Sequence, residues 1–467
     1  MKKRKNKIKE GKVAMLGRSQ KWIMVSVLLV LVMLLTGGLE ARTVLRWATI
    51  AGFYTDWAAE LVKEFEQKTG IEVEIVQMDL ATMYEKEAIE MAGRTGAYDI
   101  ITVESTWLAE WAHAGWLEPL DSYIAETPKS EFDISDVAPA LVRISCTYKD
   151  KIYALPYYTF TAGMFYRKDL FDDPGERAAF KAKYGYDLDV PKTWEQHRDI
   201  AEFFTRKAGQ TLKGEVLKHD FYGVGMMAGR FDEIQDEWMA ILWAMGGEVM
   251  DKDMNVVVNS PIGVKATQFY IDMLKFAPPG ALTSSYDEVI AQLQQGMIAM
   301  TMGMFLDQWA NAVKTEQNIP GAVIACAPAP GYTAFIGCFS VAISRDSKNK
   351  KEAWEFIKFL AGPETQRKFA LGGGTTALMS VLLDPEIQKH RDVAGHYPVL
   401  AEILKYHAEH NIEHPWLQSP AAGKIYREMS VCLCAAVAGE MTPEEAMNTL
   451  AERIRLYHSQ AIQEQKQ

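Results

Sequence analysis

The chain has 467 residues, of which 48% are hydrophobic and 24% are charged, and its formal net charge is −11. This length exceeds what one hydrophobic core usually organises, so we expect more than one lobe. The composition is that of a folded protein and excludes extended disorder. The excess of acidic residues excludes nucleic acid and anionic membranes as expected partners.

The first 41 residues have the order of a secretory signal peptide. Nine Lys and Arg residues between Lys2 and Lys21 precede an uncharged run at 22–35, and small residues follow up to Ala41. The run is short against the roughly 20 residues that span a bilayer, so we expect cleavage, with a retained anchor as the alternative. Removal of residues 1–41 would leave 41 Lys and Arg against 59 Asp and Glu, a net charge of −18.

The sequence also bears on anchoring and on disulfides. Leu35-Thr36-Gly37-Gly38 resembles the bacterial lipoprotein processing box, but Gly38 stands where the lipid-accepting Cys is required. We therefore expect export to the periplasm or to the outer face of the cytoplasmic membrane, without a lipid anchor.

Five scattered cysteines do not form a disulfide scaffold, and a bridge between Cys326 and Cys338 is left open.

Residues 44–114 alternate between strand and helix patterns. Strands are expected at 44–50, 71–75 and 98–103, and helices at 55–70, 81–92 and 106–114. This alternation predicts a right-handed parallel sheet, and ligands of such sheets bind beyond the carboxyl ends of the strands. The loops at that edge contain Tyr54, Asp79, Glu104 and Trp107.

The stretch 149–171 is predicted to connect two lobes. Pro156 removes a strand donor and biases Leu155 toward an extended conformation, so we expect a bend there. Residues 157–166 are rich in aromatic and β-branched side chains, which is typical of a strand. This strand could cross between lobes, and an ordinary buried strand after a proline turn fits the pattern equally well.

The rest of the chain is predicted to be mainly helical, with a few strands. Helices are expected at 193–207, 233–245, 260–275, 287–295, 351–360 and over most of 385–461, and strands at 297–302, 321–329 and 337–344. Thr193 and Gln196 fit a capping box.

Several segments together resemble family 1 of the extracellular solute-binding proteins of bacterial ABC importers, over nearly the whole mature chain. They are 98–101, 107–121, 153–171, 191–194, 246–248, 299–303 and 353–360. Three segments depart from the usual family pattern, namely Gly303-Met304-Phe305, Ile336-Gly337-Cys338 and Gly372-Gly373-Gly374-Thr375-Thr376.

The resemblance implies an α/β fold of two lobes, each a mainly parallel sheet flanked by helices, with the ligand in the cleft between them. It assigns residues 42–155 and 325–375 to lobe 1 and residues 156–324 and 376–467 to lobe 2. It further implies capture of a neutral carbohydrate or sugar alcohol by hinge closure and delivery to the permease subunits of an importer. We expect a monomer that is not an enzyme and has no cofactor.

A neutral polyhydroxyl ligand needs flat apolar faces for its C–H groups and fixed hydrogen-bonding groups for its hydroxyls. From loop position, we expect aromatic contacts from Trp107, Trp238, Phe305 and Trp416, polar contacts from Asp79, Glu104 and Tyr158, and further contacts from Tyr54 and Gly337. For each tryptophan, packing in the core is the competing interpretation.

Two alternatives are considered. A secreted carbohydrate-active hydrolase would need two carboxylates about 5–10 Å apart, and Glu104 with Glu237 is the candidate pair. His407, His410 and His414 have helical spacing that a zinc site could use, but the break at Pro415 favours a solvated helix end, so no metal site is expected.

Overall fold

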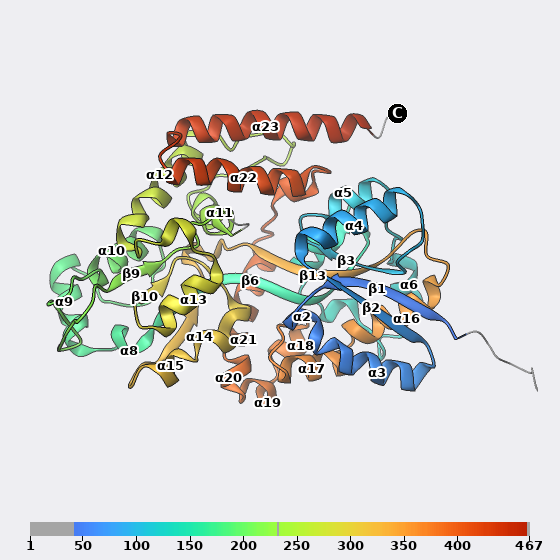
Figure 1. Ribbon diagram of the computed structural model, residues 1–467, viewed down its shortest axis with the longest axis horizontal. Coiled ribbons are helices and arrows are strands. Elements are labelled where there is room, and N and C mark those ends of the chain that lie inside the picture. The colour runs from blue at the N-terminus through green and yellow to red at the C-terminus, as the bar shows by residue number, and fades with distance from the viewer. Residues whose placement is uncertain (1–41, 231–232, 465–467) are drawn as a thin grey trace, which may run out of the picture.

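The computed structural model describes residues 42–230 and 233–464, so the signal peptide predicted at 1–41 lies outside the described residues. The chain forms two lobes that lie side by side (Figure 1). One sheet runs through both lobes in the order β2-β1-β3-β13-β6-β10-β9, and β11 and β12 also pair with β6.

The first lobe contains the half of this sheet that β2, β1, β3 and β13 form. β1 (Val44–Ile50) pairs in parallel with β2 (Glu72–Met78) and with β3 (Ile100–Glu104), as expected, and β13 (Ile336–Ile343) runs antiparallel to β3. Its longer helices are α3 (Ala58–Thr69), α4 (Leu80–Ala92), α5 (Leu108–His113) and α16 (Lys350–Ala361). The helix expected from Thr55 is divided at Trp57, whose backbone angles stay helical, and the buried Thr55 hydroxyl donates to the carbonyl of Ile50.

The strand β6 (Leu155–Arg167) joins the lobes. Its first half pairs with β13, and its second half pairs with β10 (Ile298–Thr301), β11 (Met304–Phe305) and β12 (Ile324–Ala327). The register with β13 shifts between Phe339 and Ser340, so that Tyr157 is an extra residue directly after Pro156. The irregularity lies where the sequence predicts a bend, because proline cannot donate to the ladder.

The second lobe is built on β6, β9 (Tyr222–Gly225), β10 and β12. β9 and β10 are parallel, whereas β6 runs antiparallel to β10 and β12, so the sheet is mixed in this half. Its helices include α10 (Trp194–Phe204), α11 (Ile234–Ala244), α12 (Pro261–Met273) and α13 (Tyr286–Gln294). As predicted, the Thr193 side chain caps α10 by accepting from the amide of Gln196.

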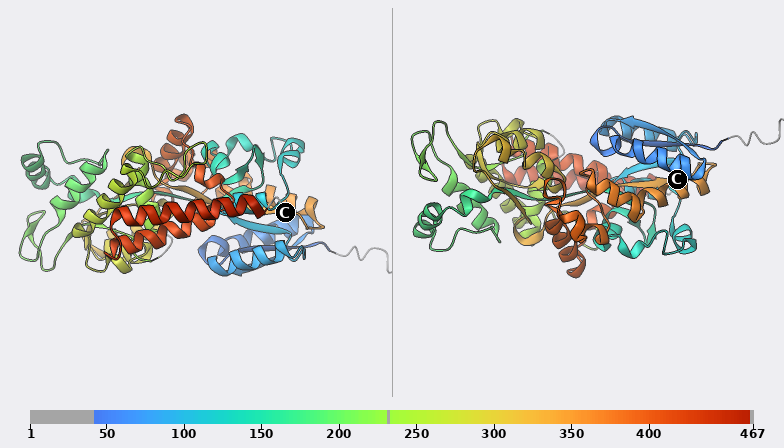
Figure 2. Two further views of the ribbon diagram at one scale, coloured as in Figure 1. Left: turned by 90° about the horizontal axis from the view of Figure 1, so that it is seen from above. Right: turned by 90° about the horizontal axis from the view of Figure 1, so that it is seen from below.

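The C-terminal helices α22 (Ala422–Val437) and α23 (Pro443–Glu464) pack against each other and lie across the top of the molecule (Figures 1 and 2). The shorter strands are β4 (Thr147–Tyr148), β5 (Lys151–Ile152), β7 (Thr211–Leu212) and β8 (Glu215–Val216). The remaining α-helices are α2 (Phe53–Asp56), α6 (Asp121–Glu126), α7 (Pro139–Leu141), α8 (Lys168–Phe171), α9 (Pro174–Tyr184), α14 (Trp309–Ala312), α15 (Thr315–Asn318), α17 (Pro363–Leu371), α18 (Met379–Leu382), α19 (Pro385–Gln388), α20 (Arg391–Ala394) and α21 (Tyr397–Glu409).

Short turns of 3-10 or π-helix complete the chain. They are η1 (Ile134–Asp136), η2 (Val142–Cys146), η3 (Leu274–Phe276), η4 (Ala281–Thr283), η5 (Leu306–Gln308), η6 (Pro330–Tyr332) and η7 (Pro415–Gln418). All five cysteines are free thiols, those of Cys326 and Cys338 included. Within the described ranges, no helix combines the length and the apolar character that crossing a membrane requires.

Candidate functional site

A cavity of about 480 Å³ opens between the two lobes. Its lining comes from the first lobe, from the second lobe and from the strands that join them. The lining residues are Ile50, Leu80, Ala81, Tyr84, Glu85, Glu104, Thr106, Trp107, Phe160, Glu233, Asp236, Tyr286, Phe305, Asp307, Gln308, Phe339, Gly423, Tyr426 and Arg427. The cavity therefore lies at the carboxyl end of β3, where a ligand site is expected in an open α/β sheet.

Aromatic side chains form the wall of the cavity on the first lobe. The Trp107 ring lies 5.1 Å from the ring of Tyr84 and 5.2 Å from that of Trp111, measured between centroids. The Tyr84 hydroxyl donates to the Glu110 carboxylate at 3.0 Å, and burial, with that carboxylate beside it, raises the pKa of Tyr84 to about 12. These contacts stay within one lobe and present a fixed apolar face to the cavity.

Glu104 is the last residue of β3, and its carboxylate is held by the loop that follows. The backbone N–H of Thr106 donates to Glu104 Oε2 at 2.8 Å, and the Thr106 hydroxyl donates to the same oxygen. Glu104 is buried yet lines the cavity. Its carboxylate is thus oriented before any ligand arrives.

Asp307 links the second lobe to the joining strand. It lies in η5, directly after β11, and its Oδ2 accepts a hydrogen bond of 2.7 Å from the hydroxyl of Tyr158 on β6. Burial raises the pKa of Asp307 to about 6. Its Oδ1 has no hydrogen-bond partner in the described part of the chain. A carboxylate oxygen in this state is ready to accept a bond from a ligand.

Three phenylalanines meet where the joining strands pass the cavity. Phe160 on β6 lies edge-on to Phe305 on β11 at 6.0 Å and packs at 5.0 Å against Phe339 on β13. All three rings line the cavity. A Cβ on Gly337 would come within 2.4 Å of the Phe160 ring, so glycine leaves the space that this ring occupies.

The C-terminal helices complete the second-lobe wall. The hydroxyl of Tyr426 on α22 donates to the carboxylate of Asp236 on α11 at 2.9 Å. The ring of Trp416 in η7 stacks behind Tyr426, with an interplanar angle of 3° and a centroid distance of 6.1 Å. Trp416 thus supports a lining residue without lining the cavity.

The structure brings three of the predicted site residues, Glu104, Trp107 and Phe305, to the cavity. Tyr158 is not among the lining residues, but its hydroxyl donates to Asp307, which lines the cavity. The side chain of Tyr54 lies outside those that the structure describes.

The other predicted residues are not among those that line the cavity. Trp238 is fully buried, and its indole N–H donates to Thr267. Asp79 caps α4 by accepting from the amide of Thr82, which lowers the pKa of Asp79. Trp416 and Gly337 pack behind the lining residues, as described above.

Sequence reasoning missed several lining residues. They are Tyr84, Glu233, Asp236, Tyr286, Asp307, Tyr426 and Arg427. A signal was available for Asp307, which follows the predicted platform Phe305 by two positions. Tyr426 and Arg427 lie far along the chain on an amphipathic helix, where only the tertiary fold brings them to the cavity.

The structure also bears on the hydrolase and the zinc site, the two alternatives raised from the sequence. Glu237 is fully buried in the second lobe, accepts from the hydroxyl of Tyr270 at 2.6 Å, and does not line the cavity, so Glu104 and Glu237 do not face a common ligand space. His407 bonds to the carbonyl of Tyr332 at 2.8 Å. In the described ranges, no group of three or more His, Cys, Asp or Glu residues could hold a metal ion.

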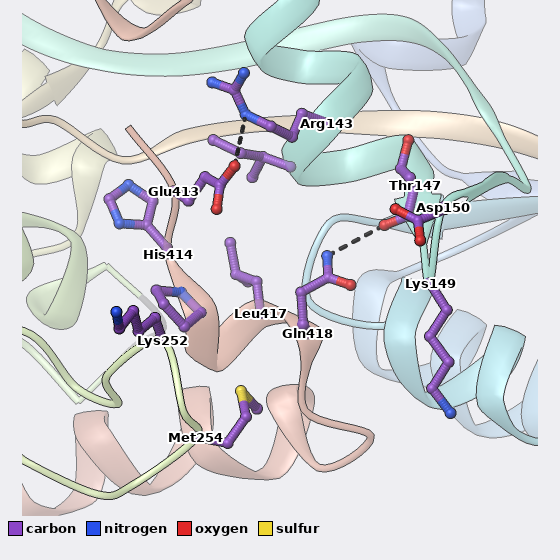
Figure 3. A pocket seen from close by; sticks show the side chains of 12 residues that line it. Arg143, Thr147, Lys149, Asp150, Lys252, Met254, Glu413, His414, Leu417 and Gln418 are labelled. Atoms are coloured by element: carbon purple, nitrogen blue, oxygen red, sulfur yellow. Dashed lines mark hydrogen bonds and ion pairs between the residues drawn. The ribbon is translucent and has the colours of Figure 1, made fainter. Parts of the chain in front are cut away.

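A second, smaller cavity of about 300 Å³ lies between η2, the turn after β4, a loop of the second lobe and η7 (Figure 3). Charged residues such as Lys149, Asp150 and Lys252 line it. Gln418 Nε2 donates to the carbonyl of Thr147 at 3.1 Å, and Arg143 Nε lies 3.6 Å from Glu413 Oε1. Since it lacks aromatic faces, the larger cavity is the better candidate for a ligand site.

The chain is similar in sequence and in fold to known binding proteins. Residues 51–367 match the family described as bacterial extracellular solute-binding protein. A probable amino-acid ABC transporter periplasmic-binding protein of Sinorhizobium fredii is 25% identical over 418 residues, 85% of each chain. A mannitol-binding protein of Pseudomonas aeruginosa is 26% identical over 277 residues, 57% of this chain and 55% of that one. The fold resembles a solute-binding protein of Agrobacterium radiobacter in complex with ribitol, with a TM-score of 0.72 at 22% identity over 88% of this chain and 98% of that one.

Proposed function

Because the chain belongs to the bacterial extracellular solute-binding proteins, it is the substrate-binding component of an ABC importer, and we propose that the interlobe cavity captures a carbohydrate or sugar alcohol. Closure of the two lobes retains the ligand, and the closed protein delivers it to the permease subunits in the membrane. The protein works as a monomer in the periplasm or at the outer face of the cytoplasmic membrane, and it releases its ligand chemically unchanged.

The composition of the cavity carries this proposal. Rings from both lobes and from the joining strands face one space, and such faces cover the C–H surface of a sugar or alditol. Glu104 and Asp307 approach it from opposite lobes and can accept bonds from hydroxyls. A ligand that contacts both lobes stabilises the closed arrangement, because it gains contacts there that the open arrangement lacks.

A thermal-shift screen against monosaccharides, disaccharides, oligosaccharides and alditols tests the proposal. A ligand at 100 times its Kd should stabilise the native protein by about 2.7 kcal/mol. Small-angle scattering should then give a smaller radius of gyration at saturation. If no sugar or alditol stabilises the protein, the proposed ligand class is wrong. Cleavage of a bound glycoside would favour the hydrolase instead.

A further inference from the structure

The walls of the interlobe cavity carry an excess of negative charge. Among the lining residues that the structure describes, five are carboxylates and one, Arg427, is a cation. The carboxylates are Glu85, Glu104, Glu233, Asp236 and Asp307. Closure of the lobes removes water from this space, and like charges then repel more strongly because the effective dielectric constant falls.

Arg427 lies at one side of the cavity. Its guanidinium sits over the ring of Tyr84 on the first lobe, 5.1 Å from the centroid. Asp307 belongs instead to η5 of the second lobe and bonds to Tyr158. Arg427 is the one Lys or Arg among the described lining residues, and it is placed beside the aromatic wall.

The acidic groups of the second lobe gather around Tyr286. Burial raises the pKa of the Tyr286 hydroxyl, and Asp287, Glu233 and Asp307 add to the increase through their charges. Glu233, Tyr286 and Asp307 all line the cavity. Asp307 is also buried, and its Oδ1 has no hydrogen-bond partner in the described ranges. This corner is therefore a polar pocket of negative potential within an otherwise aromatic cavity.

Aromatic faces surround the same space. The lining rings are Tyr84, Trp107, Phe160, Tyr286, Phe305, Phe339 and Tyr426. The face of an aromatic ring carries partial negative charge and attracts cations within about 6 Å of its centroid. Carboxylates and aromatic faces together favour a ligand that is positively charged at one end and apolar along its ring or chain.

We propose that the cavity prefers a carbohydrate or sugar alcohol that carries a protonated amine, with the ammonium group bound beside Asp307 and Glu233. This inference rests on the proposed function, narrows its ligand class, and departs from the neutral ligand expected from the sequence. An ammonium group donates three hydrogen bonds and supplies a positive charge, whereas the hydroxyl that it replaces donates one and supplies none. Phosphorylated or carboxylated sugars would meet repulsion from the same residues.

Matched pairs of ligands test this inference directly. Glucosamine with glucose, galactosamine with galactose, and 1-amino-1-deoxysorbitol with sorbitol each differ by one amine in place of one hydroxyl. Titration calorimetry at neutral pH and low salt should show that the amine of at least one pair binds about tenfold more tightly, the effect of roughly one charge-assisted contact. The preference should shrink as salt is added, since salt screens charges.

Two charge-removing variants and a control locate the contact. Asp307→Asn and Glu233→Gln should each reduce the preference for the amine and leave the affinity for the neutral partner less affected. Asp287→Asn removes the same charge at an exposed position beside Tyr286 that does not line the cavity, so it should keep the preference. Thermal unfolding of each variant verifies that it is folded.

The outcomes separate this inference from the proposed function. If neutral sugars or alditols bind as tightly as their amines, the inference is wrong and the proposed function stands. If both Asp307→Asn and Glu233→Gln keep the full preference, the assigned contact is wrong. If neither member of any pair binds and the wider carbohydrate screen also fails, the proposed function itself fails.

Discussion

The two walls of the cavity are held in place in different ways. On the first lobe, Trp107 packs against Tyr84 and Trp111, and all three belong to that lobe. On the second lobe, Asp307 is held by Tyr158, which lies in the part of β6 that pairs with β13 in the first lobe. Trp107 is thus packed within one lobe, although Arg427 of the second lobe also covers Tyr84, whereas Asp307 depends on a contact across the joining strand. Changes to the second wall should therefore alter ligand affinity and lobe arrangement together.

The largest effects are expected from two tryptophans with different surroundings. Trp107→Ala should weaken ligand binding by about 2–4 kcal/mol, because it removes an aromatic face of the cavity. Trp238→Ala should instead lower the free energy of unfolding by about 3–5 kcal/mol, because it leaves a hole in the core of the second lobe. Calorimetry and urea unfolding of both variants measure the two quantities. Equal losses of affinity in the two variants would contradict this assignment.

The pH dependence of stability reports on Glu237, which supports the second wall. Its carboxylate accepts from the amides of Met227 and Gly303 and from Tyr270, and Gly303 directly precedes β11. Burial raises the pKa of Glu237 to about 8. The native state therefore keeps the proton of Glu237 to higher pH than the unfolded state does. The stabilisation that the protonated side chain contributes is fully present below the ordinary pKa of 4.5 and is lost as the pH rises through 8.

Glu237→Gln removes this titration. Between pH 5 and 8, the stability of the parent relative to the variant should fall by about 3–4 kcal/mol. Urea unfolding at several pH values measures the difference. Parallel pH curves for the two proteins would show that Glu237 does not titrate in this range.

Tyr158→Phe breaks the contact across the joining strand. The substitution leaves the buried Asp307 carboxylate without its donor, which should cost about 1–2 kcal/mol of stability. Ligand affinity should fall as well, and the radius of gyration at saturation should change. A first-lobe variant, Tyr148→Phe, is the control: it removes a bond to His113 within that lobe, away from the cavity, and should leave the radius unchanged.

The smallest effect is expected from Asp79→Ala. Asp79 is exposed and caps α4, the helix that carries Tyr84. The substitution should lower the melting temperature slightly through loss of the cap and leave ligand affinity unchanged. A strong loss of affinity in calorimetry would mean that Asp79 contacts the ligand.

Much of the fold follows from local patterns. The alternation of strands and helices at 44–114, the cap at Thr193 and the bend at Pro156 all depend on residues close in sequence, and the structure contains each of them. The division between α2 and α3 at Trp57 was not predicted.

The site was less accessible to sequence reasoning. Glu104 and Trp107 could be found because they follow a predicted strand at its carboxyl end, which is a rule of position. Trp238 and Trp416 were expected in the site from loop position, but both are fully buried, and a large aromatic side chain serves a core equally well. Asp236 and Tyr426 meet only through the packing of two helices that are distant in sequence.

The pairing of β3 with β13 has a consequence for how the protein folds. Ser105, directly after β3, bonds to Cys338 on β13 across 233 residues of sequence. Contacts of such high sequence separation form late and slow the folding of a chain, because a long loop must close before they are made. The edge of the first lobe that lines the interlobe cavity is therefore completed only after most of the second lobe has been synthesised. A chain truncated before β13 should have neither a stable first lobe nor a ligand site.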